Sequence, residues 1–210
     1  GILLHSKDGG ETWQKQDSQI GYPIFALSFI DATRGWAAAD RATYLKTTNG
    51  GETWESGYIQ ASLEGVGADM TLALADPVFY DIQFLDANTG WIVGEFGKIY
   101  HTTDGGQNWA EQQNSLLGQA GFTDAINLPT LFGVAFTDAR YGVAVGLEGK
   151  IVTTTDGGQQ WNFVSQGETD GVLFDAEPLY APHLMSVDGN GNGGGWIVGG
   201  AGRVLRLQDG

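Results

Sequence analysis

One eight-residue phrase occurs four times in this chain and limits what the chain can fold into. Each copy joins a Ser or Thr, an Asp or Asn, two glycines and a closing Trp, and the copies span residues 6–13, 47–54, 102–109 and 154–161. A fifth copy starts at Leu207, so the Asp or Asn column stands at positions 8, 49, 104, 156 and 209. Repeats of this length, in which each repeat is one small sheet, are typical of β-propellers.

Each period predicts four short strands, which we term a to d. An alternating segment such as 25–29 is followed by a turn, a Gly-Trp strand such as 90–94, a tight turn, and a strand such as 98–102 that enters the repeated phrase. Alternation of apolar and polar residues, β-branched and aromatic enrichment and glycine at the turns are strand and hairpin signals. The sequence therefore predicts an all-β propeller of four-stranded antiparallel blades.

The predicted domain organisation is one propeller domain over residues 1–210. It divides into a partial blade at 1–20, blades at 21–76, 77–129 and 130–181, and a partial blade at 182–210. About five blades are represented, and two arrangements stay open. The blades belong either to a larger ring of six or seven, or to a compact ring of four or five whose ends share a blade.

The repeated phrase has a structural interpretation as the c–d hairpin. Asp-Gly-Gly accepts positive φ, its carboxylate accepts bonds from the backbone of its own turn, and the Trp is expected to pack between neighbouring sheets. We assign this structural role to Asp8, Trp13, Asn49, Trp54, Asp104, Trp109, Asp156 and Trp161.

Composition and charge exclude several classes of function. The chain has no cysteine and a net charge of −15, and its ten basic residues are scattered singly. Nucleic acid and anionic membrane surfaces are therefore not expected partners, whereas a neutral or basic protein surface, or a cation, fits the charge better. No apolar run approaches the roughly 18 residues of a membrane span. Because the chain opens at Gly1 in mid-blade, we expect that residues once preceded it, and these could have included a leader.

The segment 90–109, echoed at 35–54 and 142–161, resembles the photosystem II stability/assembly factor family, whose members are propellers with Asp-boxes, also called bacterial neuraminidase repeats. The resemblance implies a non-enzymatic, extracytoplasmic protein, in the periplasm, a lumen or secreted, that docks on a membrane protein complex as an assembly factor or accessory subunit. Photosynthetic members of the family present an arginine-rich patch, but this acidic chain has only five arginines. A non-photosynthetic bacterial relative is therefore indicated.

The alternative is a carbohydrate-binding propeller or a sialidase-like glycoside hydrolase fragment. Sialidase chemistry needs three converging arginines and a Tyr–Glu pair, yet Arg34 and Arg140 lie in equivalent a–b turns that local structure explains. We predict no catalytic residue, no cofactor and no metal site. His5 and His101 share one strand column, and His183 is solitary. A calcium loop is half matched from Asp188, although a flexible turn explains it better.

The predicted partner-binding face combines the b–c turns with three long d–a connections at 56–77, 113–129 and 165–182, opposite the hairpins. Apolar residues in these connections are buried either against the propeller or against a partner, and both readings stay open. The predicted partner-binding residues are Asp40, Arg41, Tyr58, Met70, Glu95, Phe96, Lys98, Phe122, Glu148, Lys150, Phe174, Tyr180 and Arg203.

Overall fold

The computed structural model describes residues 1–62, 75–164, 179–184 and 194–207. Two predicted partner-binding residues, Met70 and Phe174, lie outside the described residues, as does the half-matched calcium loop at Asp188. Most of the first and third long connections, and the side chain of His183, also fall outside the described part.

The described chain folds into five antiparallel sheets, and three of them have four strands in the order of the sequence. The all-β fold with four-stranded antiparallel repeats is therefore confirmed, whereas the division into blades and the size of the ring stay predictions. The strands are, sheet by sheet, β1 (Leu3–His5) and β2 (Gln14–Gln16); β3 (Ile24–Phe29), β4 (Gly35–Ala39), β5 (Thr43–Thr47) and β6 (Glu55–Tyr58); β7 (Phe79–Phe84), β8 (Gly90–Gly94), β9 (Ile99–Thr102) and β10 (Ala110–Glu111); β11 (Leu131–Phe136), β12 (Gly142–Gly146), β13 (Ile151–Thr154) and β14 (Asn162–Phe163); β15 (Leu179–Leu184), β16 (Gly195–Gly199) and β17 (Val204–Leu207).

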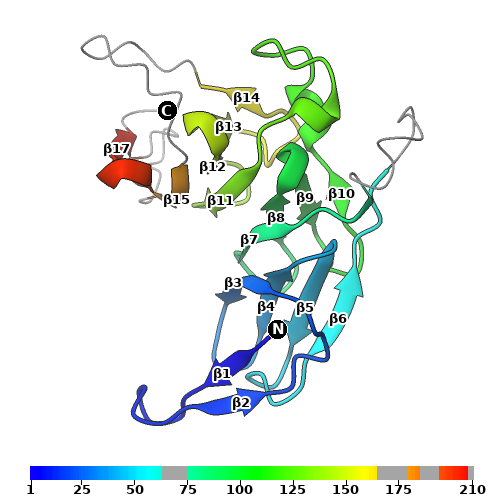
Figure 1. Ribbon diagram of the computed structural model, residues 1–210, viewed down its shortest axis with the longest axis vertical. Coiled ribbons are helices and arrows are strands. Elements are labelled where there is room, and N and C mark those ends of the chain that lie inside the picture. Colours follow the sequence, from blue (N-terminus) through cyan, green and yellow to red (C-terminus); the bar gives the residue numbers. More distant parts are fainter. Residues whose placement is uncertain (63–74, 165–178, 185–193, 208–210) are drawn as a thin grey trace.

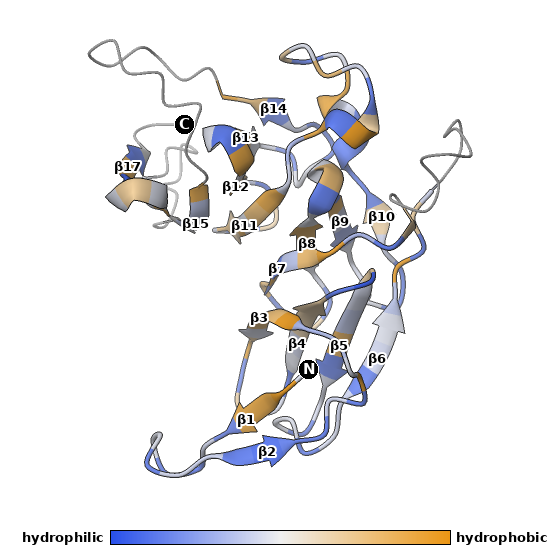
Figure 2. Cartoon of the chain, in the orientation of Figure 1, coloured by the Kyte–Doolittle hydropathy of each residue, from blue (hydrophilic) through white to orange (hydrophobic). Residues whose placement is uncertain are grey.

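The five sheets stand side by side in an arc (Figure 1). The first strands of successive sheets, β3, β7, β11 and β15, contact one another along the concave side, and β6, β10 and β14 lie on the outside. The first and last sheets lie at opposite ends of the arc. Hydrophobic residues are carried by inner and middle strands such as β8, while the outer strands β2 and β6 are hydrophilic (Figure 2).

Aromatic side chains fill the spaces between the sheets. The ring of Phe136, on β11, stacks on Trp91 of β8 with centroids 3.6 Å apart and meets Trp161 edge-on at 5.7 Å. All three side chains are at most 4% exposed. The preceding interface repeats this arrangement with Trp36, Phe84 and Trp109. This Trp-Phe-Trp cluster is the repeated unit of the core.

Each repeated phrase forms a hairpin, between the third and fourth strands of the four-stranded sheets and between β1 and β2 in the first copy. In the third copy, the Thr102 hydroxyl donates to Asp104 Oδ1 at 2.8 Å and accepts from the amide of Gly106 at 3.0 Å. Asp104 Oδ1 also accepts from the amide of Asn108, and this bond lowers the pKa of Asp104 to about 2. The carbonyl of Gly105 accepts from Trp36 Nε1 of the preceding sheet at 3.2 Å. The hairpin therefore closes its own turn and also ties two sheets together.

The closing Trp of the phrase does not pack between sheets in every copy. Trp54 and Trp161 are buried and Trp109 is partly buried, but Trp13 is 59% exposed. The prediction that the closing Trp packs between sheets is therefore wrong for Trp13. The reason is that it belongs to the two-stranded sheet at one end of the arc, where no described sheet covers it. Its Nε1 instead donates to the carbonyl of Gly10 at 3.0 Å.

Loss of the threonine hydroxyl in a buried hairpin should destabilise the protein. Thr154 is 3% exposed, and its Oγ1 accepts from the buried amide of Gly158 at 2.8 Å. Thr154→Val keeps the side-chain shape but leaves this amide unpaired, so we expect a loss of about 1–3 kcal/mol in the free energy of unfolding. Urea denaturation measures it. Ser6→Ala, at the equivalent exposed hairpin, should cost less than about 0.5 kcal/mol because water replaces the hydroxyl. Equal losses in both variants would contradict the prediction.

Polar side chains of β7 form hydrogen bonds with backbone groups of β11 that do not pair with β12. Asp81 Oδ2 accepts from the amide of Val134 at 2.9 Å, and Gln83 exchanges two bonds with the backbone of Phe136. Asp81 Oδ1 accepts from the amide of Ile82, yet burial outweighs these bonds and raises the pKa of Asp81 to about 6. A partly buried carboxylate therefore links two sheets.

Asp81 should make the protein more stable as the pH falls from 7 to 5. Because its folded-state pKa is raised above the ordinary value of 3.8, the charged form is penalised in the fold above pH 6, and the penalty vanishes below about pH 4. The full effect is about 3 kcal/mol. Urea denaturation of the protein and of Asp81→Asn between pH 4.5 and 8 should give a stability difference that changes with pH. A constant difference would refute the assignment, and the comparison removes the general effect of the net negative charge.

Candidate protein-binding face

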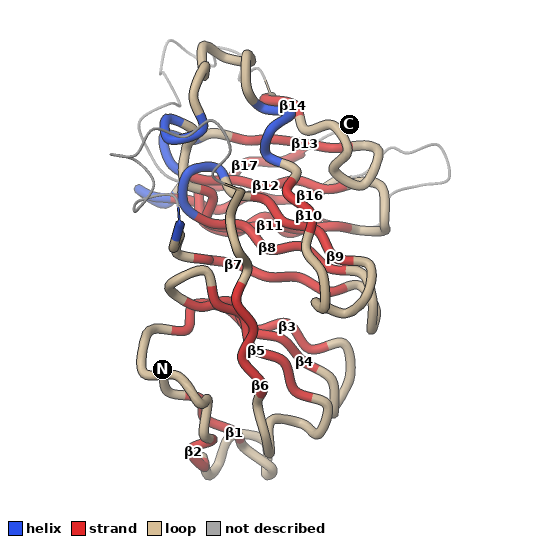
Figure 3. Tube along the Cα trace, turned by 90° about the vertical axis from the view of Figure 1, so that its right-hand side faces the viewer, coloured by secondary structure: helices blue, strands red, loops and turns tan. Residues whose placement is uncertain are grey.

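The b–c turns and the d–a connections lie at one edge of the sheets, opposite the hairpins. Figure 3 shows several short helices, in blue, to the left of the strands and the hairpin loops, in tan, to the right, while one short helix near β14 crosses the middle of the view. The b–c turns contain η1 (Glu95–Gly97), η4 (Leu147–Gly149) and η6 (Gly200–Gly202), and the second long connection contains η2 (Gln113–Leu116) and η3 (Ala125–Asn127). We call this edge the turn face.

The b–c turns share one backbone but differ in the side chain at the second position. That residue adopts a left-handed φ in all four turns, with values of 57° at Arg41, 55° at Phe96, 56° at Glu148 and 52° at Ala201. In the last three turns, the amide that follows the turn donates back to the first residue at 3.0 to 3.1 Å. Non-glycine residues seldom adopt this conformation, and the rest of each turn holds it in place. The turns thus form a constant frame that presents a different side chain from each sheet.

Two predicted residues come together beside the first of these turns. Arg41 and Tyr58 line one hollow of about 320 Å³, together with Tyr22 and Asp76. The Tyr58 hydroxyl donates to Asp76 Oδ1 at 2.7 Å, and this bond raises the pKa of Tyr58 to about 12. The Arg41 guanidinium lies 5.5 Å from the centroid of the Tyr22 ring. Tyr58 is 54% exposed, so its ring is open to a partner.

Lys98 does not belong to the exposed face. It is 3% exposed, and its Nζ donates to Glu111 Oε1 at 3.0 Å inside the protein. Burial alone would raise the pKa of Glu111, but the bond and charge of Lys98 hold this pKa below its ordinary value. The prediction that Lys98 contacts a partner is corrected, because its ammonium group forms an internal ion pair. Lys150, which occupies the same column in the next repeat, is partly buried.

The second long connection packs against the propeller. Leu116 and Leu128 are at most 3% exposed and join the core cluster of Trp91 and Phe136. Phe122 is partly buried, and its ring stacks on Phe163 of β14 at 5.2 Å. Burial against the propeller therefore accounts for these apolar residues, and Phe122 offers only part of its ring to a partner.

Four aromatic rings on the concave side form a continuous ladder that sequence reasoning did not assemble. Phe25, Tyr80, Phe132 and Tyr180 are spaced by centroid distances of 5.1, 5.1 and 5.5 Å. Each is the second residue of its strand, where the register of β3, β7, β11 and β15 shifts. A bulge re-aims a side chain out of the regular alternation. The repeated aromatic after the first strand residue was the available signal, but only Tyr180 was predicted as a binding residue.

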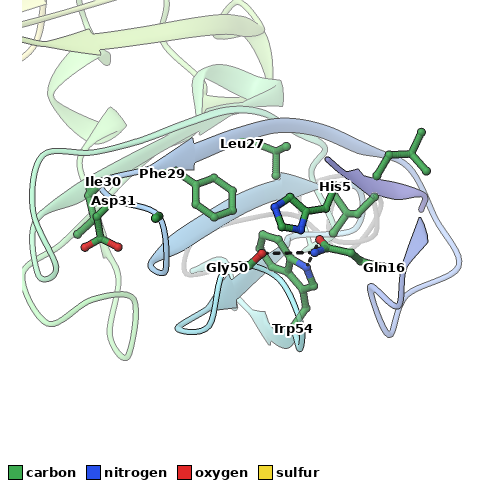
Figure 4. A pocket seen from close by; sticks show the side chains of 11 residues that line it. His5, Gln16, Leu27, Phe29, Ile30, Asp31, Gly50 and Trp54 are labelled. Carbon is green, nitrogen blue, oxygen red and sulfur yellow. Dashed lines mark hydrogen bonds between the residues drawn. The ribbon is translucent and has the colours of Figure 1, made fainter. Parts of the chain in front are cut away.

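A hollow of about 520 Å³ opens between β1 and β3 (Figure 4). Leu27, Phe29, His5 and Trp54 line it, and Gln16 bridges its floor by accepting from Trp54 Nε1 and donating to the carbonyl of Gly50. Its one carboxylate, Asp31, accepts from Arg34 Nε at 2.7 Å and from two backbone amides. The carboxylate is therefore bonded within its own turn, and the other polar side chains of the lining are His5 and Gln16.

The candidate arginines and histidines are held by local structure. Arg34 pairs with Asp31 in its own turn, and the Arg140 guanidinium lies over the ring of Tyr141 at 5.3 Å. His101 stacks on Trp91 at 4.6 Å, and burial lowers its pKa. Within residues 1–62, 75–164, 179–184 and 194–207, no three His, Asp or Glu side chains gather as metal ligands. None of the helices in the same residues has the length and apolar character to span a membrane.

Comparison with known families tests the resemblance that the sequence motifs indicate. A family model described as photosynthesis system II assembly factor YCF48 matches residues 68–125, and a BNR/Asp-box repeat model matches residues 4–15. The resemblance to the YCF48 assembly-factor family is confirmed. The photosystem II assembly lipoprotein Ycf48 of Synechococcus sp. (strain CC9902) is 26% identical over 182 residues, covering 86% of this chain and 48% of the relative. The chloroplastic photosystem II stability/assembly factor HCF136 of Arabidopsis thaliana is 28% identical over 174 residues, covering 76% and 40%. The chain thus spans less than half the length of both relatives.

Solved structures agree with the propeller fold. YCF48 bound to D1 peptide has a TM-score of 0.52 at 21% identity and covers 88% of this chain and 65% of its own. YCF48 from Cyanidioschyzon merolae has a TM-score of 0.54 at 20% identity, covering 90% and 57%. An ancestral GH74 enzyme has a TM-score of 0.61 at 14% identity, covering 97% and 28%. At these identities the likeness establishes the fold and not the activity.

Proposed function

We propose that this chain is part of a non-enzymatic, extracytoplasmic propeller that binds protein and serves as an assembly factor or accessory subunit of a membrane protein complex. The observation that carries the proposal is the turn face, where one repeated backbone presents a different side chain from each sheet. Surfaces of this kind, with constant frames and variable loops, suit protein recognition. The family resemblance adds that relatives are named as photosystem II assembly factors and that one solved relative is described as bound to D1 peptide.

The chemistry of the turn face supports binding rather than turnover. Its exposed groups are of mixed type, with the basic Arg41 and the aromatic Tyr58 on the first four-stranded sheet and the acidic Glu148 on the third. The hollows described above at Tyr58 and at Phe29 hold neither two facing carboxylates nor a set of converging arginines. Most enzymes that hydrolyse a glycosidic bond need two carboxyl groups that flank it.

The proposed compartment follows from the relatives and not from the fold. One curated relative is named a photosystem II assembly lipoprotein, and another is named a chloroplastic photosystem II stability/assembly factor. We extend this to an extracytoplasmic location for the present chain, with attachment to the membrane through its partner.

Charge reversal on the turn face tests the proposal. Glu148 is exposed at the tip of its turn, so Glu148→Lys should leave the fold intact and lower the amount of a co-purifying membrane protein at least fivefold. The experiment is purification of the tagged protein from native membranes in mild detergent, followed by mass spectrometry. Glu11→Lys is the matched control, because it makes the same charge change on the opposite, hairpin edge.

A wild-type protein that purifies without a stoichiometric partner would count against protein binding. Equal recovery of the partner with Glu148→Lys would count against a contact at this turn, while protein binding would stand. Binding to a glycan array by a protein that purifies alone would support the alternative of a carbohydrate-binding propeller.

A further inference from the structure

The aromatic ladder is a continuous apolar stripe that stays open at both ends. Phe25 is 45% exposed and Tyr180 is 50% exposed, while Tyr80 and Phe132 between them are partly buried. Solvent-exposed aromatic rings in a row are unfavourable unless a partner covers them. The ladder lies on the concave side, at the ends of β3, β7, β11 and β15 that adjoin the turn face.

Carboxylates border the ladder. Asp40 and Glu95 are the first residues of the first and second b–c turns, and Glu95 Oε2 accepts from the amide of Val78, two residues before Tyr80. Burial raises the pKa of Tyr80, and the charges of Glu95 and Asp40 raise it further, which places both carboxylates within electrostatic reach of the ring. Two basic residues of this region are engaged elsewhere, since Arg41 lies over Tyr22 and Lys98 pairs with Glu111. Asp40 and Glu95 therefore give the stripe a negative border beside Tyr80.

We propose that the ladder binds an extended peptide segment in which apolar residues alternate with arginine or lysine. This inference rests on the protein-binding function proposed above and names the segment of the partner that is recognised. The apolar side chains cover the rings of Phe25, Tyr80, Phe132 and Tyr180, and the cationic groups approach Asp40 and Glu95. A segment of about five residues, at 3.3 Å per residue, covers the ladder.

The ring geometry favours a peptide over a sugar chain. Neighbouring rings meet at 62° and 70° at the first two contacts and at 41° at the third. The edge of one ring therefore partly covers the face of the next, which gives a corrugated stripe and not a row of parallel platforms. Side chains that alternate along an extended backbone fit such corrugations, whereas a sugar ring stacks on an open aromatic face.

Titration calorimetry with defined peptides tests the proposal on the whole chain. The probe is the blocked octapeptide of four Leu-Arg repeats, and the comparison probe is the corresponding Leu-Glu peptide. We expect the Leu-Arg peptide to bind at least tenfold more tightly and to weaken as salt is raised, because screening reduces the attraction of the carboxylates. Equal binding of the two peptides would overturn the proposed charge preference. Tighter binding of cellohexaose than of either peptide would overturn the choice of a peptide.

Two variants locate the binding on the ladder. The double variant Phe25→Ser/Tyr180→Ser removes the two half-exposed rings and should weaken binding of the Leu-Arg peptide about tenfold or more. Glu95→Gln keeps an acceptor for Val78 but removes the charge, and it should weaken binding several-fold. Leu27→Ser is the matched control, because Leu27 is 52% exposed on the same strand as Phe25 but lines the hollow beside β1. Denaturation midpoints equal to that of the wild type show that the variants fold.

The two proposals fail in different ways. A double variant that binds the Leu-Arg peptide as tightly as the wild type, or captures the same membrane protein in the same amount, overturns the ladder while protein binding stands. A wild-type chain that captures no membrane protein contradicts the proposed function, and the peptide titration still decides whether the ladder binds basic segments.

Discussion

Phe136→Ala should lower the free energy of unfolding by about 3–5 kcal/mol. The ring is 4% exposed, lies flat on Trp91 at 3.6 Å and meets Trp161 edge-on at 5.7 Å. Truncation removes the apolar burial and both aromatic contacts, so a cavity remains between the sheets. Urea denaturation followed by tryptophan fluorescence measures the loss.

Phe29 provides an internal control for this prediction. It occupies the same strand position in the first four-stranded sheet and meets Trp54 edge-on at 6.0 Å, but it is 45% exposed. No described tryptophan stacks on its other face. Phe29→Ala should therefore cost less than about 1.5 kcal/mol, since less area is buried. If both variants lost the same stability, the stacked tryptophan would not be the source of the large effect.

Glu111→Gln should cost about 3 kcal/mol, although it changes one atom. Lys98, 3% exposed, would keep its ammonium group inside the protein without the carboxylate that lies 3.0 Å away. Breaking a buried ion pair from one side is strongly destabilising because it leaves an uncompensated charge. In the wild type, the Tyr100 hydroxyl and the Ser62 backbone amide donate to Glu111 Oε1. The side-chain carbonyl of the glutamine would still accept both of these bonds.

The double variant Lys98→Met/Glu111→Gln isolates the charge. Methionine fills a similar volume without a charge, so the double variant should recover to within about 1 kcal/mol of the wild type. A double-mutant cycle from urea denaturation then gives the coupling energy of the pair. Additive losses from the two single substitutions would show that Lys98 and Glu111 do not stabilise each other.

The repeated phrase and the Gly-Trp strands predicted the strand order, because these signals are local. Asp104 is held by bonds within its own turn, and glycines 105 and 106 adopt positive φ as their sequence requires. Alternation along Phe79–Phe84 likewise depends only on neighbours in the chain. The residues of each repeat therefore determine the strands and the hairpin of their own sheet.

The exposure of individual side chains could not be predicted from local sequence signals, because it depends on which side chains of the next sheet cover them. Phe29 and Phe136 share one column, yet only Phe136 has a tryptophan stacked on it. Lys98 follows a turn that the sequence predicted to be exposed, but its ammonium group pairs with Glu111 of β10 inside the protein.

The sequence by itself determined the repeat, its four strands and its hairpins, since these follow from propensity and turn chemistry within about 50 residues. The tertiary structure alone decided which residues form a surface. The aromatic ladder is the clearest case, because two whole sheets lie between the sheet of Phe25 and the sheet of Tyr180 along the chain. Only the packing of β3, β7, β11 and β15 along the concave side, with a bulge in each, brings their rings into one stripe.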